Sequence, residues 1–391
     1  MLSVKYLVGI FLVLSAAAMG WFILGATLVV RTEASDSAQR TTLGALWGTA
    51  LVQDAPAFAT TVRRGKKSQT YATDPSASRV DVGLDLDLRR KGLLWYNTYR
   101  VAFEGTYRVV NPHPGGTLQM AFTLPSEAGT YDDLAVTVDG RPVATASAGG
   151  IVCVPVHTSG GRAASVTVRY RSRGLGTWTY RLGHGVVTAR DVALTMRTNF
   201  KAIDFPALTL APTAEREIPG GWQLTWAYRE IVTGEAIGMT FPKPLQPGPL
   251  AQRITFWAPL SLLFYVFVML VITALRRIEL HPVNYLFLAA AFFAFHLLFA
   301  YTVDRIRVEY AFVLCAAVSM ALTISYLRLV AGLRFAAVEA ALAQFFYLIL
   351  FSYALFDEGY SGLSITIGAI VTLFVTMQLT GRIRWSERFA A

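Results

Sequence analysis

The strongest constraint on the fold of this chain is a run of 25 residues, Tyr6–Val30, that contains no charged side chain. A helix needs about 20 apolar residues to cross the hydrocarbon core of a bilayer, whereas the apolar core of a cleavable signal peptide has about 7–15. The run also continues well past Ala16–Ala18, the small residues that imitate a cleavage site. We therefore expect residues 6–30 to form an uncleaved signal anchor.

Five more apolar runs follow and predict a helical bundle over residues 254–381, with a short tail at 382–391. Together with the anchor they give six transmembrane helices in a one-plus-five arrangement. The composition agrees, because 54% of the residues are hydrophobic and only 15% are charged, against about 25% charged in soluble domains. The five runs are 254–275, 283–303, 308–330, 335–356 and 362–381.

Basic residues beside the spans predict the orientation, since Lys and Arg collect on the cytoplasmic side of a membrane. With the N-terminus inside, the basic residues of the cytoplasmic face are Lys5, Arg276, Arg277, Arg328, Arg334, Arg382, Arg384 and Arg388. Fewer basic residues, and several acidic ones, lie next to the spans on the other face. Both termini are thus predicted to be cytoplasmic, and residues 31–253 extracytoplasmic.

The extracytoplasmic part divides into a helix with a polar linker over 31–78 and an all-β domain over 79–250. Residues 80–88 alternate strictly: Val82, Leu84, Leu86 and Leu88 share one face, while Asp81, Asp85 and Asp87 share the other. Alternation with period two marks a half-buried strand, and similar stretches recur between turn signals. We expect an antiparallel β-sandwich or jelly roll, followed by a proline-rich strap over 241–249.

The net charge of +10 raises the question of an anionic partner. An extracytoplasmic domain does not normally meet nucleic acid, so we expect no nucleic-acid partner. The basic run of Arg63, Arg64, Lys66 and Lys67 suits anionic lipid headgroups or an envelope polymer, since each such charge contributes about 1 kcal/mol near an anionic surface. The alternative is a solvated, basic stretch of linker.

Catalytic and metal-binding signatures are absent from the sequence. It has no His-Glu-x-x-His pair, no phosphate loop and no Gly-x-Ser-x-Gly elbow, and only two cysteines and five histidines. Asp81, Asp85 and Asp87 offer oxygens to calcium, but a flat strand face supplies few of the 6–8 ligands that this ion takes. We expect no catalytic residue, metal or cofactor.

Polar side chains inside the spans are costly and therefore informative. His296 lies deep in the third span, Glu339 lies about one turn inside the fifth, and Gln344 lies deeper still. They indicate either a relay or binding cavity inside the bundle, with Arg328 or Arg334 neutralising Glu339, or interhelical hydrogen bonds alone. Stripes of small residues predict that spans four and five pack closely; they are Ala317, Ala321 and Ser325, and Ala336 and Ala340.

Several motifs of the membrane part resemble the CreD family of bacterial inner-membrane proteins. His281-Pro282-Val283-Asn284-Tyr285-Leu286 opens the third span after a basic turn, as the family's His-Pro-x-x-Tyr-Leu does. The stretch that ends at Trp385 resembles the family's closing Thr-Arg-x-Ile-Asp-Trp, with Arg384 in place of the Asp. Pro282 suits the first turn of a helix, and Tyr285 and Trp385 are predicted to anchor spans at headgroup level.

The resemblance implies a bacterial inner-membrane protein associated with cell-envelope integrity and without established catalytic residues. Our first hypothesis is therefore a non-enzymatic protein that supports envelope integrity or stress tolerance through its periplasmic β-domain. Its partners would be the lipid bilayer and an envelope polymer or membrane protein. The alternatives are a transporter or membrane enzyme with a site around His296, Glu339 and Gln344, and a ligand sensor that acts through a partner.

Overall fold

The computed structural model folds into two compact units. The helical unit comprises Met1–Ser37, Gly92–Leu94 and Leu245–Ala391, and the β-unit comprises Ala38–Lys91 and Trp95–Pro244. The structure describes residues 4–64, 67–91, 93–113, 117–127, 129–157, 162–242, 244–357, 359 and 361–381.

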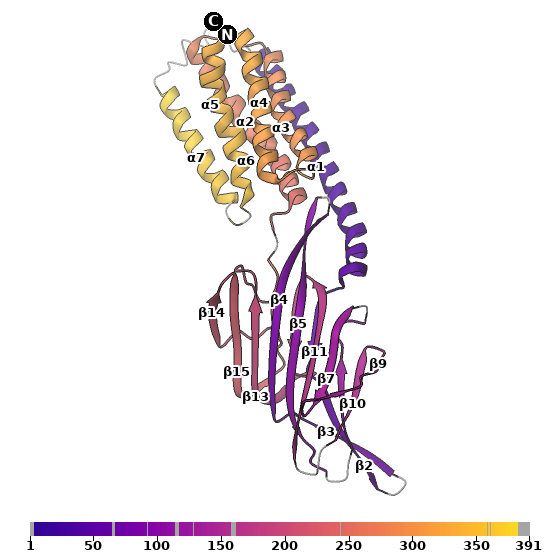
Figure 1. The fold of residues 1–391 in the computed structure, drawn as a ribbon. Coiled ribbons are helices and arrows are strands. Elements are labelled where there is room, and N and C mark those ends of the chain that lie inside the picture. Colours follow the sequence, from indigo (N-terminus) through magenta and orange to yellow (C-terminus); the bar gives the residue numbers. More distant parts are fainter. Residues whose placement is uncertain are drawn as a thin grey trace. The chain divides into compact units, whose positions relative to one another are not determined.

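The helical unit holds five helical segments that are long and apolar enough to cross a membrane. A sixth helix, α7, carries a shorter apolar stretch, Ile365–Gln378, so that the predicted one-plus-five arrangement is confirmed. Figure 1 shows the helices of this unit running side by side. They are α1 (Val4–Trp47), α2 (Pro247–Arg276), α3 (Pro282–Thr302), α4 (Val308–Val330), the composite fifth span (Phe335–Phe356) and α7 (Ser361–Thr380).

The ends of α2 and α3 follow from their sequences. Pro282 occupies the first turn of α3, where its missing N–H group is no loss. The side chain of His281 caps the same helix by accepting a hydrogen bond from the backbone N–H of Val283 at 3.3 Å. Arg277 ends α2 in the left-handed conformation, with φ of 58°, and directs the chain into the turn before α3.

Glycines bring α1 close to the bundle. A Cβ atom on Gly9 would lie 3.2 Å from the ring of Pro282, and one on Gly25 would lie 3.0 Å from the ring of Phe256. Small residues at such contacts allow helices to approach closely in a membrane. Arg31 then joins α1 to the far end of α3, because its guanidinium lies 3.5 Å from the carboxylate of Asp304.

The fifth span is irregular. It runs through the π-helical segment η1 (Phe335–Ala340), α5 (Ala341–Gln344), a second π-helical segment η2 (Phe345–Leu350), α6 (Phe351–Tyr353) and the 3₁₀ turn η3 (Ala354–Phe356). The two π-helical segments are longer than the usual single-turn π-bulge. They rotate the side chains that follow them away from the positions that these side chains would have in a regular α-helix. The predicted close packing of spans four and five is confirmed, since α4 contacts η1 and Ala336 and Ala340 are fully buried. The stripe of α4 is wrong as the contact surface, because Ala317, Ala321 and Ser325 are exposed.

Sixteen strands of the described chain form three sheets. An eight-stranded sheet has the order β14-β15-β13-β4-β5-β11-β7-β8, a five-stranded sheet the order β3-β2-β6-β10-β9, and a three-stranded sheet the order β1-β12-β16 (Figure 1). The strands are β1 (Leu51–Asp54), β2 (Ala57–Arg64), β3 (Lys67–Thr73), β4 (Ala77–Lys91), β5 (Leu94–Val110), β6 (Thr117–Thr123), β7 (Tyr131–Val138), β8 (Arg141–Val143), β9 (Ser147–Ala148), β10 (Ile151–Val156), β11 (Ala163–Leu175), β12 (Thr177–Arg181), β13 (Val187–Thr198), β14 (Ala214–Ile218), β15 (Gly221–Thr233) and β16 (Ile237–Thr240).

The β-unit begins earlier in the chain than the sequence pattern predicts. α1 continues to Trp47, and residues 51–73 then form β1, β2 and β3 instead of a polar linker. Short polar and β-branched residues hide the pattern here: in β2, Phe58 and Thr60 are buried while Thr61 and Val62 lie half-exposed. Two strand pairs, β1–β12 and β4–β13, are parallel where an antiparallel sandwich is expected.

One apolar core is shared by all three sheets. Alternation places Val82 and Leu84 in it from β4, and Leu224 and Trp226 from β15. The buried hydroxyls of Tyr107 and Tyr180 lie 3.1 Å apart and hydrogen-bond to each other. Burial raises the pKa of both tyrosines well above the ordinary value of 10, so both hydroxyls remain protonated.

Trp226→Ala tests the importance of this core. Trp226 is fully buried and donates an indole hydrogen bond of 2.9 Å to the carbonyl of Leu210, so we expect the change to lower the free energy of unfolding by about 3–5 kcal/mol. Val232→Ala, at a position that is 66% exposed, is the control and should shift it by less than about 0.5 kcal/mol. Urea unfolding of the detergent-solubilised chain measures both free-energy changes. Cleavage of the β-unit by a protease reports the unfolded fraction at each urea concentration. Equal midpoints for the two variants would contradict the assignment of the core.

Candidate functional site

A groove of about 720 Å³ crosses one face of the eight-stranded sheet. Five adjacent strands supply its walls and floor: β13, β4, β5, β11 and β7. Its volume is in the range of pockets that hold small ligands, about 300–1,000 Å³. Because side chains alternate along each strand, the groove lies on the face opposite the apolar core.

Small residues form the floor of the groove. Gly83 of β4, Ala102 of β5 and Ala135 of β7 lie between the long charged side chains. A Cβ atom on Gly83 would lie 3.8 Å from the Cβ of Ala102, an ordinary van der Waals contact. The sheet itself therefore tolerates a larger residue at position 83, and the absence of a side chain there leaves room above the strands.

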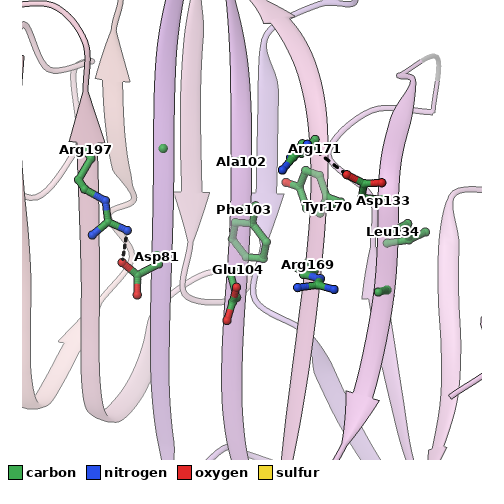
Figure 2. A pocket seen from close by; sticks show the side chains of 12 residues that line it. Asp81, Ala102, Phe103, Glu104, Asp133, Leu134, Arg169, Tyr170, Arg171 and Arg197 are labelled. Carbon is green, nitrogen blue, oxygen red and sulfur yellow. Dashed lines mark hydrogen bonds and ion pairs between the residues drawn. The ribbon is translucent and has the colours of Figure 1, made fainter. Parts of the chain in front are cut away.

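Three arginines and three acidic residues line the groove. Figure 2 shows one ion pair at each side: Arg197 with Asp81, at 3.0 Å, and Arg171 with Asp133, at 3.3 Å. All four side chains are at least half-exposed, and exposed ion pairs contribute only about 0–1 kcal/mol each. A ligand can displace them at little cost.

Glu104 and Arg169 lie between these two pairs (Figure 2). They occupy directly opposed positions of β5 and β11, and both are exposed. Within the described part of the chain, neither side chain makes a hydrogen bond or an ion pair. The middle of the groove thus offers one carboxylate and one guanidinium that are not engaged.

A β-bulge shapes one wall. Arg169 pairs with Ala135 and Arg171 with Asp132, so that two residues of β7, Asp133 and Leu134, lie opposite the single residue between the two arginines. Asp133 has a φ of 55°, a conformation that residues other than glycine seldom adopt. Bulges often redirect a side chain next to a binding site, and this one brings the Asp133 carboxylate to Arg171.

The three aspartates of β4 do not form a calcium site in this arrangement. Asp81 pairs with Arg197, and Asp87 lies 2.9 Å from Arg89 and 3.5 Å from Arg100. The described residues contain no group of three or more His, Cys, Asp or Glu side chains placed to hold a metal ion. On this face of β4, Asp81 and Asp87 form ion pairs with arginines.

Three of the four predicted headgroup-binding residues, Arg63, Arg64 and Lys67, belong to β2 and β3. Arg63 is opposite Ser68 in the register, and Arg64 is opposite Lys67. Lys66 and the side chain of Arg64 lie outside the described residues. The pairing places the backbones of Arg63, Arg64 and Lys67 at the ends of β2 and β3, and the binding role of the run stays a prediction.

Inside the bundle, hydrogen bonds join three helices at one level. The amide of Gln344 donates to the hydroxyl of Ser319 at 2.9 Å, and Ser319 donates to the carbonyl of Ala291 at 2.7 Å. Gln344 and Ser319 are both fully buried. This chain of hydrogen bonds links the fifth span to α4 and α3.

His296 contacts different neighbours. Its Nδ1 atom lies 2.8 Å from the carbonyl of Phe292, one turn earlier in α3, and must donate the proton because a carbonyl only accepts. The imidazole also packs edge-to-face against Trp21 of α1, with ring centroids 5.5 Å apart. Both side chains are buried, so that His296 joins the anchor to the bundle.

Glu339 pairs with Arg276 of α2, and not with Arg328 or Arg334 as the sequence suggests. The π-helical turn of η1 directs its carboxylate toward α2. The three predicted residues also lie at different depths, because at 1.5 Å per residue His296, Gln344 and Glu339 are about 21, 14 and 6 Å from the starts of their spans. α3 and the fifth span run in the same direction, since α4 crosses between them, so the structure does not gather the three around one site.

The motif residues at the start of α3 are structural. Tyr285 is fully buried, with its ring 6.4 Å from that of Tyr6 in an edge-on contact, and is not a headgroup anchor. Leu286 is 46% exposed on the outside of the bundle. Pro282 and His281 start and cap the helix, and Trp385 lies outside the described residues.

The groove is the feature that sequence reasoning missed. Arg169, Arg171 and Arg173 alternate along β11 with the same period as the aspartates of β4. That pattern predicts a charged face on each strand separately. Only the sheet order, which inserts β5 between them, shows that the acidic and basic rows are neighbours.

Ser319→Ala tests the hydrogen bonds inside the bundle. The change leaves the buried amide of Gln344 without its acceptor, so we expect a loss of about 1–3 kcal/mol of stability. The double variant Ser319→Ala/Gln344→Leu should recover part of that loss, whereas Ser325→Ala, at an exposed position of the same helix, should leave stability unchanged. Thermal denaturation in detergent measures these three variants and the single variant Gln344→Leu. A double variant that loses the sum of both single losses would show that the two side chains are not coupled.

Comparison with known proteins finds one family model that matches the C-terminal part of the chain. Residues 202–386 match the family model described as "Inner membrane protein CreD", and the resemblance drawn from the motifs is confirmed there, since all five motif residues fall inside the match. No curated protein matches the chain.

Solved structures give only weak likenesses. A putative nutrient binding protein from Legionella pneumophila is 9% identical, with a TM-score of 0.31 over 56% of this chain and 76% of that one. An M1 zinc metallopeptidase from Deinococcus radiodurans is 13% identical, with a TM-score of 0.26 over 43% of this chain and 42% of that one. At these values neither likeness informs function.

Proposed function

We propose, from the premise that residues 202–386 belong to the CreD family of inner membrane proteins, that this protein supports cell-envelope integrity through its β-unit. The observation that carries the proposal is the charged groove of about 720 Å³ on the exposed face of the eight-stranded sheet. It provides a concave surface with convergent polar groups, which is the usual form of a binding site. The protein acts by binding an envelope component and not by chemistry.

The helical unit serves as the membrane platform. Two polar contacts join its helices: Gln344 with Ser319, and Glu339 with Arg276. Interhelical bonds of this kind stabilise a bundle in lipid. The alternative of a single binding or catalytic cavity needs His296, Glu339 and Gln344 around one point, which their separate depths do not favour; a relay along the bundle is tested by the His296 variant.

The excess of basic residues beside the predicted cytoplasmic ends of the spans supports the proposal that the β-unit lies on the outer side. Cys153 provides a direct test, because it is exposed in the β-unit while Cys315 is buried in α4. A thiol reagent that does not cross bilayers should label the protein in intact spheroplasts as strongly as after lysis, and Cys153→Ser should abolish the signal. Labelling that requires lysis would place the β-unit in the cytoplasm.

A strain that lacks the gene tests the role itself. We expect it to stop growing at detergent concentrations that the parent tolerates, because an envelope-binding function is lost. Expression of the intact chain from a plasmid should restore growth. Equal tolerance of parent and deletion strain across detergents and other envelope stresses would refute the proposed function.

A further inference from the structure

The arrangement of charges in the groove restricts what can bind there. Arg169, Arg171 and Arg197 face Asp81, Glu104 and Asp133, so the lining has no net charge. A polyanion or a polycation would be attracted by half of these groups and repelled by the other half. The groove therefore favours a ligand that carries charges of both signs.

Glu104 and Arg169, in the middle of the groove, determine where the charges of a ligand bind. Glu104 and Arg169 point into the groove from neighbouring strands, between two ion pairs that are already closed (Figure 2). A guanidinium binds a carboxylate through two parallel hydrogen bonds, and a carboxylate accepts bonds from an ammonium group. One ligand can satisfy both if its own charges lie close together.

Spacing along an extended peptide fits this requirement. Glu104 of β5 and Arg169 of β11 are directly opposed on neighbouring strands, so their Cβ atoms are about 5 Å apart and the charged ends of these long side chains can diverge further. In an extended peptide laid across the strands, side chains at positions i and i+2 are about 7 Å apart. Acidic and basic side chains two residues apart can thus reach Arg169 and Glu104 together.

We propose that the groove binds a short, extended peptide that carries both acidic and basic groups, oriented by Arg169 and Glu104 over the small residues Gly83, Ala102 and Ala135. This inference rests on the proposed function. It gives the chemical class of the envelope component that the β-unit binds. The β-bulge at Asp133, which is otherwise an unexplained distortion of β7, holds one wall of the groove open for that peptide.

Calorimetric titration of the detergent-solubilised full chain tests the assignment. The probe is the peptide Ala-Glu-Ala-Lys-Ala, compared with Ala-Glu-Ala-Glu-Ala and Ala-Lys-Ala-Lys-Ala at the same ionic strength, all three acetylated at the N-terminus and amidated at the C-terminus so that only the side chains carry charge. We expect the mixed-charge peptide to bind at least about tenfold more tightly than either single-sign peptide, because only it satisfies both central groups. Arg169→Gln and Glu104→Gln should each weaken its binding by a similar factor.

Gly83→Val provides a steric test that leaves every charge in place. The new side chain occupies the floor without a backbone clash, so peptide affinity should fall at least about tenfold while the thermal midpoint stays at the wild-type value. Ala227→Val is the matched control, since Ala227 is exposed on β15, outside the groove, and should leave affinity unchanged.

The outcomes separate this inference from the proposed function. Equal affinity for the three peptides, no measurable binding, or full affinity in Gly83→Val would each overturn the peptide assignment, even where the deletion strain is sensitive to detergent. A deletion strain of normal tolerance would refute the envelope role, whereas peptide binding is measured on the purified chain and is judged separately.

Discussion

Each long strand of the eight-stranded sheet must bury one face and expose the other, and the rest of the β-unit depends on this constraint. Side chains alternate with period two, so the residues that place Val82, Leu84 and Leu224 in the core also place a row of charges on the opposite face. The sheet order then sets the acidic row of β4 beside β5 and the basic row of β11. The groove results from the same alternation that builds the core.

The helical unit is surrounded by lipid instead of water, and this changes which contacts stabilise it. Within a bilayer, polar groups that find no partner are costly, and the buried polar side chains are accordingly used to join helices. Gln344 and Ser319 bond at mid-span, Trp21 and His296 pack between α1 and α3, and Arg31 reaches Asp304 at the end of the anchor. These contacts fix the positions of the helices.

The sequence predicts the membrane spans and the all-β character well because both depend on periodicity, which a single chain displays. The sequence predicts poorly which side chains contact one another. Glu339 was expected to pair with the nearest arginines along the chain, but the π-helical turns of the fifth span direct it to Arg276 of α2. Tyr285 looks like an interfacial aromatic residue, yet α1 covers it with Tyr6.

The groove shows the same limit more clearly. Asp81 and Arg197 are 116 positions apart in the chain, and a parallel pairing of β4 with β13 brings them together. Neither the parallel pairing nor the bulge at Asp133 has a local signature, because both arise from how distant strands meet. A charged strand face predicts exposure, and only the assembled sheet gives the charges a common site.

The central claim is that the groove, and not the interior of the bundle, performs the function. The most direct test is to complement the deletion strain with two variants of equal membrane abundance: Arg169→Gln/Glu104→Gln in the groove, and His296→Ala in the bundle. Growth on detergent is the readout. We predict that the groove variant fails to restore growth and that the His296 variant restores it. Full restoration by the groove variant together with failure of the His296 variant would contradict the account.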